Sequence, residues 1–372
     1  MTTSARNSKV LPRRQKGLTL VEIMVAVTLG LILTAGLIQV FVSNKQVYRV
    51  QEGLARMQEN GRFALDFITR DVRGAGFAGC AGNTTPIVNT LNNAISLPWN
   101  FASPMQGFEW NSVASSWNPA LDASLTSPTN PNPPLSGDVL TVRRSVGDAV
   151  PVINQAPGAP PGSAPITVAA AACPANPPNP LCDFDTPSNP PPNPIAMISD
   201  CTNTAVFQVT NPNPSSGTIN HAAPGGANPG NATNALGKDF TNTAEIVRLS
   251  TITYYIRTGV LGRPALWRQE GANLAQELVE GVENMQIRYG VDTDTDRVPN
   301  QYLQANAVTD FNNVVSVRVD LLLQSIEDNL TNAPQTYIYN NVTCPGGAGC
   351  PPTDRRYRQV FSATIGLRNK IL

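Results

Sequence analysis

The sequence predicts an α+β fold, in which one long N-terminal helix precedes an antiparallel sheet. After Glu22 the chain carries no charge until Lys45, and apolar residues then continue at helical spacing as far as Val72. Beyond residue 241, several segments alternate apolar and polar residues, as strands do. Between these regions, residues 151–229 hold more than half of the 33 prolines, which is typical of loops.

The apolar run from Leu18 to Val42 predicts a transmembrane helix. At ~1.5 Å per residue it is long enough to cross a hydrocarbon core of ~30 Å. Residues 1–17 contain basic but no acidic side chains, so the positive-inside bias places the N-terminus in the cytoplasm and the rest of the chain outside. A secretory signal would end in a small-x-small cleavage site, which does not follow Val42, so an uncleaved anchor is the alternative. The basic residues are Arg6, Lys9, Arg13, Arg14 and Lys16.

Glu22 is the one carboxylate at the start of this apolar run. A charged side chain inside a bilayer costs roughly 2.5 to 3.5 kcal/mol on insertion scales, so such a residue indicates a function and requires a partner. That partner lies either in a neighbouring subunit or in the same chain. A third alternative is that the carboxylate reaches the membrane interface.

The helix is expected to continue beyond the membrane as an amphipathic segment, residues 43–74. Its apolar residues are spaced by three or four, with charged residues between them. Gly53 and Gly61 each weaken a helix by ~1 kcal/mol relative to Ala and suggest bends. The helix is expected to end near Arg73, because Gly74-Ala75-Gly76 follows.

The remaining chain divides into a loop-rich inserted region with short strands, 75–240, and a C-terminal antiparallel sheet region, 241–372. The Pro-rich part of the insertion is expected to bury too little apolar surface to form a regular core element. The predicted strands are Val139–Val146, Ala196–Ser199, Ala205–Thr210, Glu245–Arg257, Ala265–Arg268, a strand within Gln276–Tyr289, Val314–Leu323 and Tyr357–Leu367.

Six cysteines in an exported chain with a single histidine indicate disulfides formed in the periplasm rather than a metal cluster. Cys344 and Cys350 enclose a Gly-rich loop, and Cys173 and Cys182 enclose a Pro-rich one, so each pair is expected to form a local bridge. Cys80 and Cys201 then remain as long-range partners. Six cysteines allow about fifteen pairings, so this connectivity is one hypothesis among them.

The charge balance argues against direct nucleic-acid binding. The formal net charge is zero, but the first 17 residues contain only basic charges, so the remaining chain is mildly acidic. Binding to nucleic-acid phosphates usually requires an excess of basic side chains.

Catalytic motifs were not found. The chain contains no phosphate-binding Gly-rich loop followed by Lys-Ser/Thr, no Gly-x-Ser-x-Gly and no His-Glu-x-x-His. His221 is the single histidine, so neither a His-based triad nor a multi-histidine metal site can be built, and its Pro/Gly-rich surroundings predict a solvent-exposed loop. We therefore expect no enzyme activity and no cofactor.

A weak calcium-binding pattern occurs at Asp292, Asp294 and Asp296, because alternate carboxylates begin many calcium loops. However, Arg297 stands where an EF-type loop has Gly, and Leu303 stands where it has a bidentate Glu. The favoured interpretation is a solvated turn between strands.

The junction Lys16-Gly17-Leu18-Thr19-Leu20-Val21-Glu22 resembles the type IV prepilin signal. The resemblance implies that a prepilin peptidase cuts between Gly17 and Leu18, that Leu18 becomes the N-methylated N-terminus, and that Glu22 pairs with the free N-terminus of a neighbouring subunit. Leu18 departs from Phe, the commonest residue of the family at this position. The signal also implies a pilin-like fold, with the helix packed on the sheet.

Three further segments resemble the PilW family of minor pilins. They are GRFALDFITRDVRGAGFAGC (residues 61–80), LVEGVENMQIRYGVD (residues 278–292) and RYRQVFSATIGLRN (residues 356–369). With the signal they lie at both ends and in the C-terminal half of the chain, and related pseudopilins share the general layout.

The resemblance implies a structural minor pilin, inserted in the inner membrane and then built into an extracellular type IV pilus. It implies priming of assembly near the tip, and through the pilus twitching motility, adhesion or DNA uptake. The implied partners are other minor and major pilins, the prepilin peptidase, the inner-membrane assembly platform, a large tip adhesin and, before assembly, membrane lipid. Two alternatives are a minor pseudopilin of a type II secretion system and a membrane-anchored periplasmic binding module or enzyme.

Overall fold

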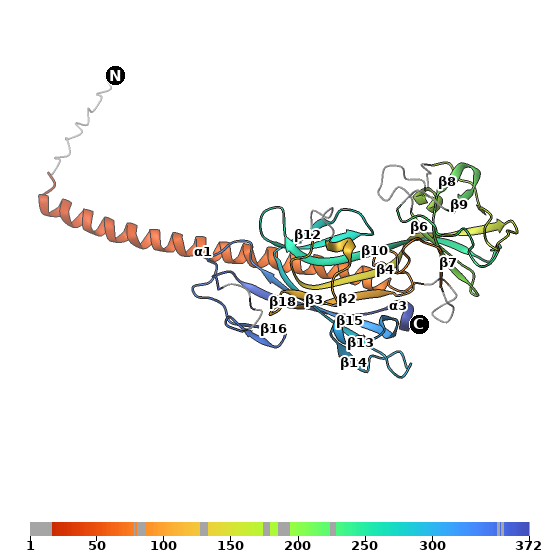
Figure 1. Cartoon of the computed structure of the whole chain (residues 1–372). Helices are drawn as coiled ribbons and strands as arrows, with labels where there is room; N and C mark the ends of the chain where they lie inside the picture. Colours follow the sequence, from red (N-terminus) through yellow and green to blue (C-terminus); the bar gives the residue numbers. More distant parts are fainter. Residues whose placement is uncertain are drawn as a thin grey trace, which may run out of the picture. The chain divides into compact units, whose positions relative to one another are not determined.

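The computed structural model describes residues 17–77, 79, 87–126, 133–173, 179–184, 194–223, 228–347, 350 and 353–371. It confirms the α+β class, because one long N-terminal helix is followed by many strands in sheets (Figure 1). The chain divides into two compact units, residues 1–52 and Gly53–Leu372, and each is described by itself.

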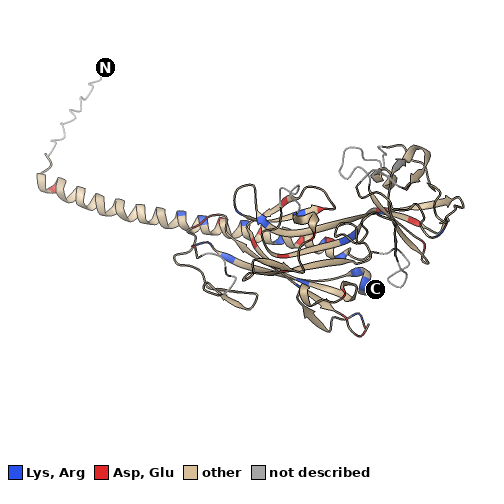
Figure 2. Cartoon of the chain, viewed as in Figure 1, with Lys and Arg blue, Asp and Glu red and all other residues tan. Residues whose placement is uncertain are grey.

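Helix α1 spans Leu20–Arg73, within one turn of the predicted bounds. In the first unit its side chains up to Val42 are exposed, and Figure 2 shows how long this part runs without charge. By length and composition, α1 can cross a membrane. In the second unit α1 has a stripe of buried residues at helical spacing, namely Met57, Gly61, Ala64, Ile68 and Val72.

The described residues of the second unit form three sheets. The largest has 12 strands, with the order β1-β7-β6-β10-β4-β5-β9-β8, while β11 and β12 extend it from β10, and β2 and β3 from β4. Its strands are β1 (Ile87–Asn89), β2 (Met105–Asn111), β3 (Ser116–Asn118), β4 (Ser136–Gln155), β5 (Ile166–Val168), β6 (Ile195–Ser199), β7 (Thr204–Gln208), β8 (Asn211–Asn213), β9 (Thr218–Asn220), β10 (Glu245–Thr258), β11 (Pro264–Glu270) and β12 (Gln276–Glu280).

The second sheet is antiparallel and has four strands in the order β14-β13-β15-β18. These are β13 (Val282–Val291), β14 (Gln301–Leu303), β15 (Val314–Gln324) and β18 (Arg358–Gly366). A hairpin of β16 (Tyr337–Tyr339) and β17 (Val342–Cys344) forms the third sheet. The short helical segments are α2 (Ala123–Thr126), α3 (Arg368–Ile371) and the 3₁₀ turns η1 (Pro180–Phe184), η2 (Pro214–Ser216), η3 (Ala305–Ala307) and η4 (Phe311–Asn313).

The main core lies between the buried stripe of α1 and both large sheets. Apolar residues of β4, β10, β13, β15 and β18 join the stripe in one cluster. Each large apolar side chain that is fully buried there contributes about 1.5–3 kcal/mol. This cluster explains why the C-terminal strands could be predicted, because their alternating apolar residues are the ones that face the helix.

A buried carboxylate, Asp71, joins α1 to the 12-stranded sheet. It lies near the helix C-terminus and is 4 % exposed. Its Oδ1 is 2.8 Å from Arg144 Nε on β4, and its Oδ2 is 3.6 Å from Arg268 Nε on β11. The hydroxyl of Tyr254 on β10 donates a hydrogen bond to Oδ2 at 2.5 Å. One carboxylate therefore holds three strands against the helix.

Gly53 and Gly61 allow close packing within one continuous helix, whereas the sequence suggested bends there. A Cβ atom added to Gly61 would lie 2.7 Å from the ring of Phe361 on β18. A Cβ atom added to Gly53 would lie 2.7 Å from Cδ1 of Leu330. The two glycines therefore let these side chains reach the helix surface.

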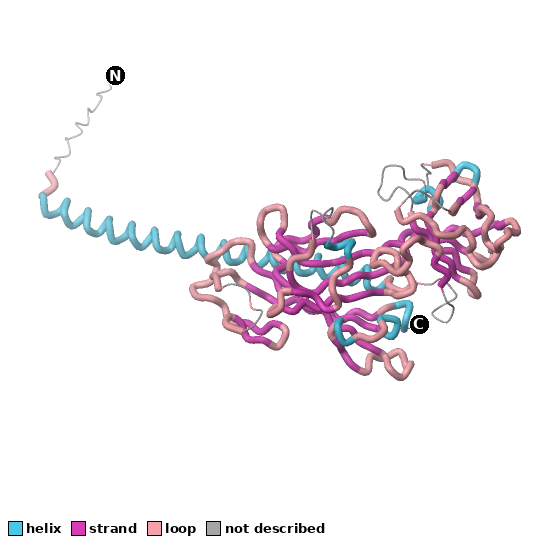
Figure 3. Tube along the Cα trace, in the orientation of Figure 1, coloured by secondary structure: helices cyan, strands magenta, loops and turns pink. Residues whose placement is uncertain are grey.

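The expectation that the Pro-rich insertion forms no regular core element is wrong. A second hydrophobic cluster includes Ile166, Phe184, Phe207 and Phe240, all at most 1 % exposed. The strand predicted over Val139–Val146 also extends to 20 residues as β4. Figure 3 shows that strands recur between the loops of this region.

Buried amide side chains explain how the inserted region can pack although it is rich in proline and asparagine. Asn231 is fully buried; its Oδ1 accepts from Gln208 N at 2.7 Å and its Nδ2 donates to Gln208 O at 2.8 Å. Gln155 Nε2 donates to Gly162 O and Ala164 O, and its Oε1 accepts from Phe240 N. These bonds satisfy backbone groups that no strand ladder reaches. Average composition does not reveal them.

His221 is buried, so the prediction of a solvent-exposed loop residue is also wrong. It is 2 % exposed, its Nε2 lies 3.0 Å from Ala164 O, and its ring packs 5.2 Å from that of Phe207. Burial lowers the pKa of the imidazole. The Pro/Gly-rich surroundings indicated a loop correctly, but they did not show that β7 would cover it.

Two predicted disulfides are confirmed. Cys173 bonds to Cys182, and Cys344 bonds to Cys350, so each bridge closes a local loop as expected. The third predicted pair joins Cys80 to Cys201, and Cys80 lies outside the described residues. That bridge stays a prediction.

Candidate functional site

The candidate site is the N-terminal end of α1. Thr19 directly precedes the helix, and Glu22 stands in its first turn. Thr19 N and Thr19 Oγ1 both donate to Glu22 Oε2 at 3.0 Å. In return, Glu22 N donates to Thr19 Oγ1 at 3.3 Å. This reciprocal pair is a capping box, in which each side chain satisfies a backbone N–H at the helix start.

The capping box gives Glu22 a partner in its own chain, but that partner carries no charge. Thr19 offers an amide and a hydroxyl, which bind a carboxylate without neutralising it. Glu22 forms no ion pair with any residue that the structure describes. Within the described part of the chain the carboxylate therefore has no cationic partner, and its Oε2 is held in a fixed place at the start of the uncharged part of α1.

The peptide bond between Gly17 and Leu18 lies just before this cap. Residues 17–19 precede the regular helix, and Leu18 is 74 % exposed. A Cβ atom on Gly17 would meet no heavy atom within 4 Å. Gly17, Leu18 and Glu22 therefore lie within one short segment, and the Gly17–Leu18 bond is accessible. Residues 1–16 lie outside the described part of the chain.

Thr19 is the site residue that the sequence reasoning missed. The signal was present, because Thr followed three residues later by Glu is the capping-box pattern before an apolar run. Glu22 therefore has a second role besides its charge, which is to start the helix.

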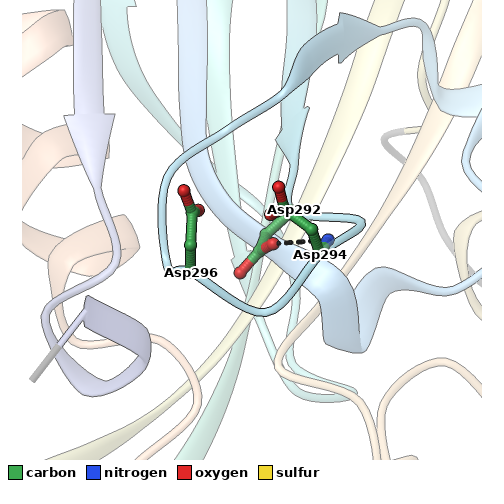
Figure 4. Close-up of side chains that lie close together, drawn as sticks. All are labelled: Asp292, Asp294 and Asp296. Atoms are coloured by element: carbon green, nitrogen blue, oxygen red, sulfur yellow. Dashed lines mark hydrogen bonds between the residues drawn. The ribbon is translucent and has the colours of Figure 1, made fainter.

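The three aspartates of the calcium pattern lie on one loop after β13 (Figure 4). Oxygen atoms of Asp292, Asp294 and Asp296 come within 4.8 Å of one another. Asp292 accepts backbone N–H bonds from Asp294, Thr295 and Arg297, at 3.1, 2.7 and 2.8 Å. Although partial burial acts to raise the pKa of Asp292, these amides lower it overall. They also use both of its carboxylate oxygens to shape the turn.

A second acidic pair, Glu109 and Asp138, joins the two larger sheets. Asp138 on β4 accepts from Trp110 N at 2.9 Å and from Ile287 N on β13 at 2.7 Å. Gln286 Nε2 donates to Asp138 at 2.6 Å and to Glu109 at 3.0 Å. Burial raises the pKa of both carboxyl groups, and the charge of Glu109 raises that of Asp138 further. Both carboxylates accept hydrogen bonds from protein groups, so the pair is part of the packing between the sheets.

Two family models match the chain. Residues 253–369 match the type IV pilus-assembly protein W (PilW) family, and residues 12–38 match the prokaryotic N-terminal methylation motif. The comparison with curated proteins and the comparison with solved structures gave no match. Of the three segments that resemble PilW, residues 278–292 and 356–369 lie inside the first match, whereas residues 61–80 lie outside both. The methylation motif contains the whole of the candidate site.

Proposed function

We propose that this chain, a PilW-like pilin of the type IV pilus, is a structural minor subunit that enters the filament through the N-terminal end of α1. The observation that carries the proposal is the carboxylate of Glu22, the fifth residue after an accessible Gly17–Leu18 bond. Thr19 fixes this carboxylate, and no described residue supplies a cation to it. We assign no catalytic role to any residue.

Processing at this end supplies the missing cation. Cleavage after Gly17 by a prepilin peptidase gives Leu18 a free α-amino group, and N-methylation of that amine keeps it basic. The amine of one subunit then pairs with Glu22 of its neighbour and fixes their axial register. Within a membrane or a packed filament such a pair is buried, so removing one member costs about 3–5 kcal/mol.

The exposed apolar surface of α1 supports the proposed location and partners. Before assembly, membrane lipid covers this surface, with the chain single-pass in the inner membrane and its N-terminus in the cytoplasm. After assembly, the helices of other minor and major pilins replace the lipid in the extracellular pilus. The inner-membrane assembly platform and a large tip adhesin are the further proposed partners.

The size of the second unit, Gly53–Leu372, supports a position near the tip. A unit this large is difficult to repeat along a tightly packed filament. We therefore propose that the chain primes assembly together with other minor pilins, and that its contribution to twitching motility, adhesion or DNA uptake comes through the pilus.

Glu22→Gln is expected to reduce the amount of this chain in sheared pili at least tenfold. That ratio corresponds to a loss of roughly 1.4 kcal/mol or more in the free energy of incorporation. Gln retains the hydrogen-bond acceptor of the capping box but removes the negative charge. Immunoblots of sheared pili and of membranes measure the effect. Thr19→Ser is the matched control, since it keeps the cap and the charge, and it should be incorporated normally.

Normal incorporation of Glu22→Gln would contradict charge pairing. If Glu22→Gln were incorporated while Thr19→Ala and Glu22→Ala were both lost, capping alone would explain the need for Glu22.

We propose no metal cofactor for this function. If the three aspartates after β13 held Ca²⁺ for structural purposes, titration with millimolar Ca²⁺ would release or absorb heat. Isothermal calorimetry on the purified chain is expected to give no heat beyond dilution, because backbone amides already occupy both oxygens of Asp292. Heat that Asp294→Asn and Asp296→Asn abolish would contradict this expectation.

A further inference from the structure

Strand β18 is an outer strand of the four-stranded sheet. It pairs with β15 along its whole length, from Arg358 opposite Gln324 to Gly366 opposite Ser316, without a register shift. On its other side, no strand of the described chain pairs with it. A nine-residue strand therefore has one open edge.

The hydrogen bonds at its two ends show which residues face that edge. Ser325 N donates to Tyr357 O and Leu367 N donates to Val315 O, so the odd-numbered residues direct their backbone groups toward β15. Arg358 points the other way, because its N–H and C=O bond to the side chain of Gln335. Since backbone directions alternate along a strand, Val360, Ser362, Thr364 and Gly366 direct their N–H and C=O groups outward.

These four residues make no hydrogen bond through the outward groups to any other described residue. The side chains of Ser362 and Thr364 are also exposed. Gln335 closes the edge at Arg358 alone, so the free part of the strand begins immediately after it. The row of unpaired groups is therefore available to water or to another chain.

This edge lacks the features that normally prevent strand addition. Natural edge strands are short, charged, bulged or interrupted by proline. Residues 359–366 contain no charge and no proline, and the pairing with β15 has no bulge. By contrast, the outer strands β1 and β14 have three residues each, and β12 contains Glu277 and Glu280.

The charges at the ends of β18 indicate what kind of strand fits. Arg358 is neutralised internally by Glu283 and Asp354. Arg368, just beyond the other end, is exposed and has no ion pair among the described residues. If two copies of β18 paired antiparallel about Ser362, Gly366 of each would lie opposite Arg358 of the other, whose outward N–H and C=O already bond to Gln335. A second copy therefore could not pair along the whole open edge, which disfavours it.

We propose that the open edge of β18 binds an extended strand of a different protein, uncharged along the pairing and with an acidic residue beside Arg368. Main-chain hydrogen bonds to Val360, Ser362, Thr364 and Gly366 supply the affinity, and the acidic residue selects the direction. The inference goes beyond the proposed function, because it needs neither cleavage at Gly17 nor the charge of Glu22.

Amide hydrogen exchange of the full chain in detergent micelles tests the inference. The probe is a capped peptide of alternating Thr and Val with one terminal Glu. It is expected to slow exchange in residues 359–367 by roughly tenfold, and a peptide ending in Lys is expected to slow it less. Thr364→Pro should abolish the protection, because it removes an outward N–H and leaves the pairing with β15 intact.

Thr364→Val is the matched control and should retain the protection. If circular dichroism shows that Thr364→Pro is unfolded, Ser362→Pro is used in its place, because it also removes an outward N–H. Unchanged exchange with the Glu peptide would overturn the inference. Protection that instead rises with the concentration of the chain, without any peptide, would overturn it in favour of a second copy.

Discussion

Gly17→Val is expected to leave the chain at full precursor length and to exclude it from pili. Gly17 lies in an accessible segment before α1, within the match to the methylation motif, and we propose that cleavage follows it. A β-branched side chain there places bulk beside the bond to be cleaved and stiffens the backbone. Without cleavage no N-terminal amine forms at Leu18, so Glu22 of the neighbour stays unpaired. Intact mass of the membrane form and immunoblots of sheared pili measure both effects.

Gly36→Val provides the control for this variant. Gly36 lies in the same uncharged part of α1, and a Cβ atom there also meets no heavy atom within 4 Å. This variant should lose its leader normally and remain in the membrane before assembly. A Gly17→Val chain that is still shortened by the mass of residues 1–17 would contradict the cleavage assignment.

Asp71→Asn is expected to lower the free energy of unfolding of the second unit by roughly 3 kcal/mol, since it leaves Arg144 and Arg268 beside a neutral amide. Both arginines are mostly buried, with side chains 20 and 23 % exposed. Tyr254 also loses its anionic acceptor. Denaturant unfolding followed by circular dichroism measures the change.

Asp66→Asn is the matched control for the buried carboxylate. Asp66 lies on the same helix and pairs with Arg70 at 3.3 Å, but both side chains are about two-thirds exposed. We expect a change of at most about 0.5 kcal/mol, as for exposed i, i+4 pairs. Equal losses from the two variants would show that Asp71 does not join the helix to the sheet.

The parts of the fold that follow one hydrophobic period could be predicted from the sequence. Helix α1 was predicted to within two residues at its start, and β10 and β15 to within one, because each carries a regular series of apolar residues that pack into the main core. Strand β2 was missed. Its residues MQGFEWN are buried at successive positions, so they do not alternate. Its place in the fold comes from pairing with β4, which no local pattern records.

The candidate site was predictable because its residues are close in sequence. Gly17, Leu18 and Glu22 span one short segment, and their spacing was sufficient to propose the site from the sequence alone. The buried pair Glu109 and Asp138 was not predictable, since the two residues come together only when Phe108 pairs with Val139. The burial of His221 depended in the same way on a distant strand.

The central claim is that this chain enters a filament by a processed N-terminus that pairs with Glu22. The mass and N-terminal sequence of the protein purified from membranes test it most directly. The account predicts a chain that lacks residues 1–17 and begins with a methylated Leu18. A chain that keeps its first 17 residues, or one cut at any other position, would contradict it.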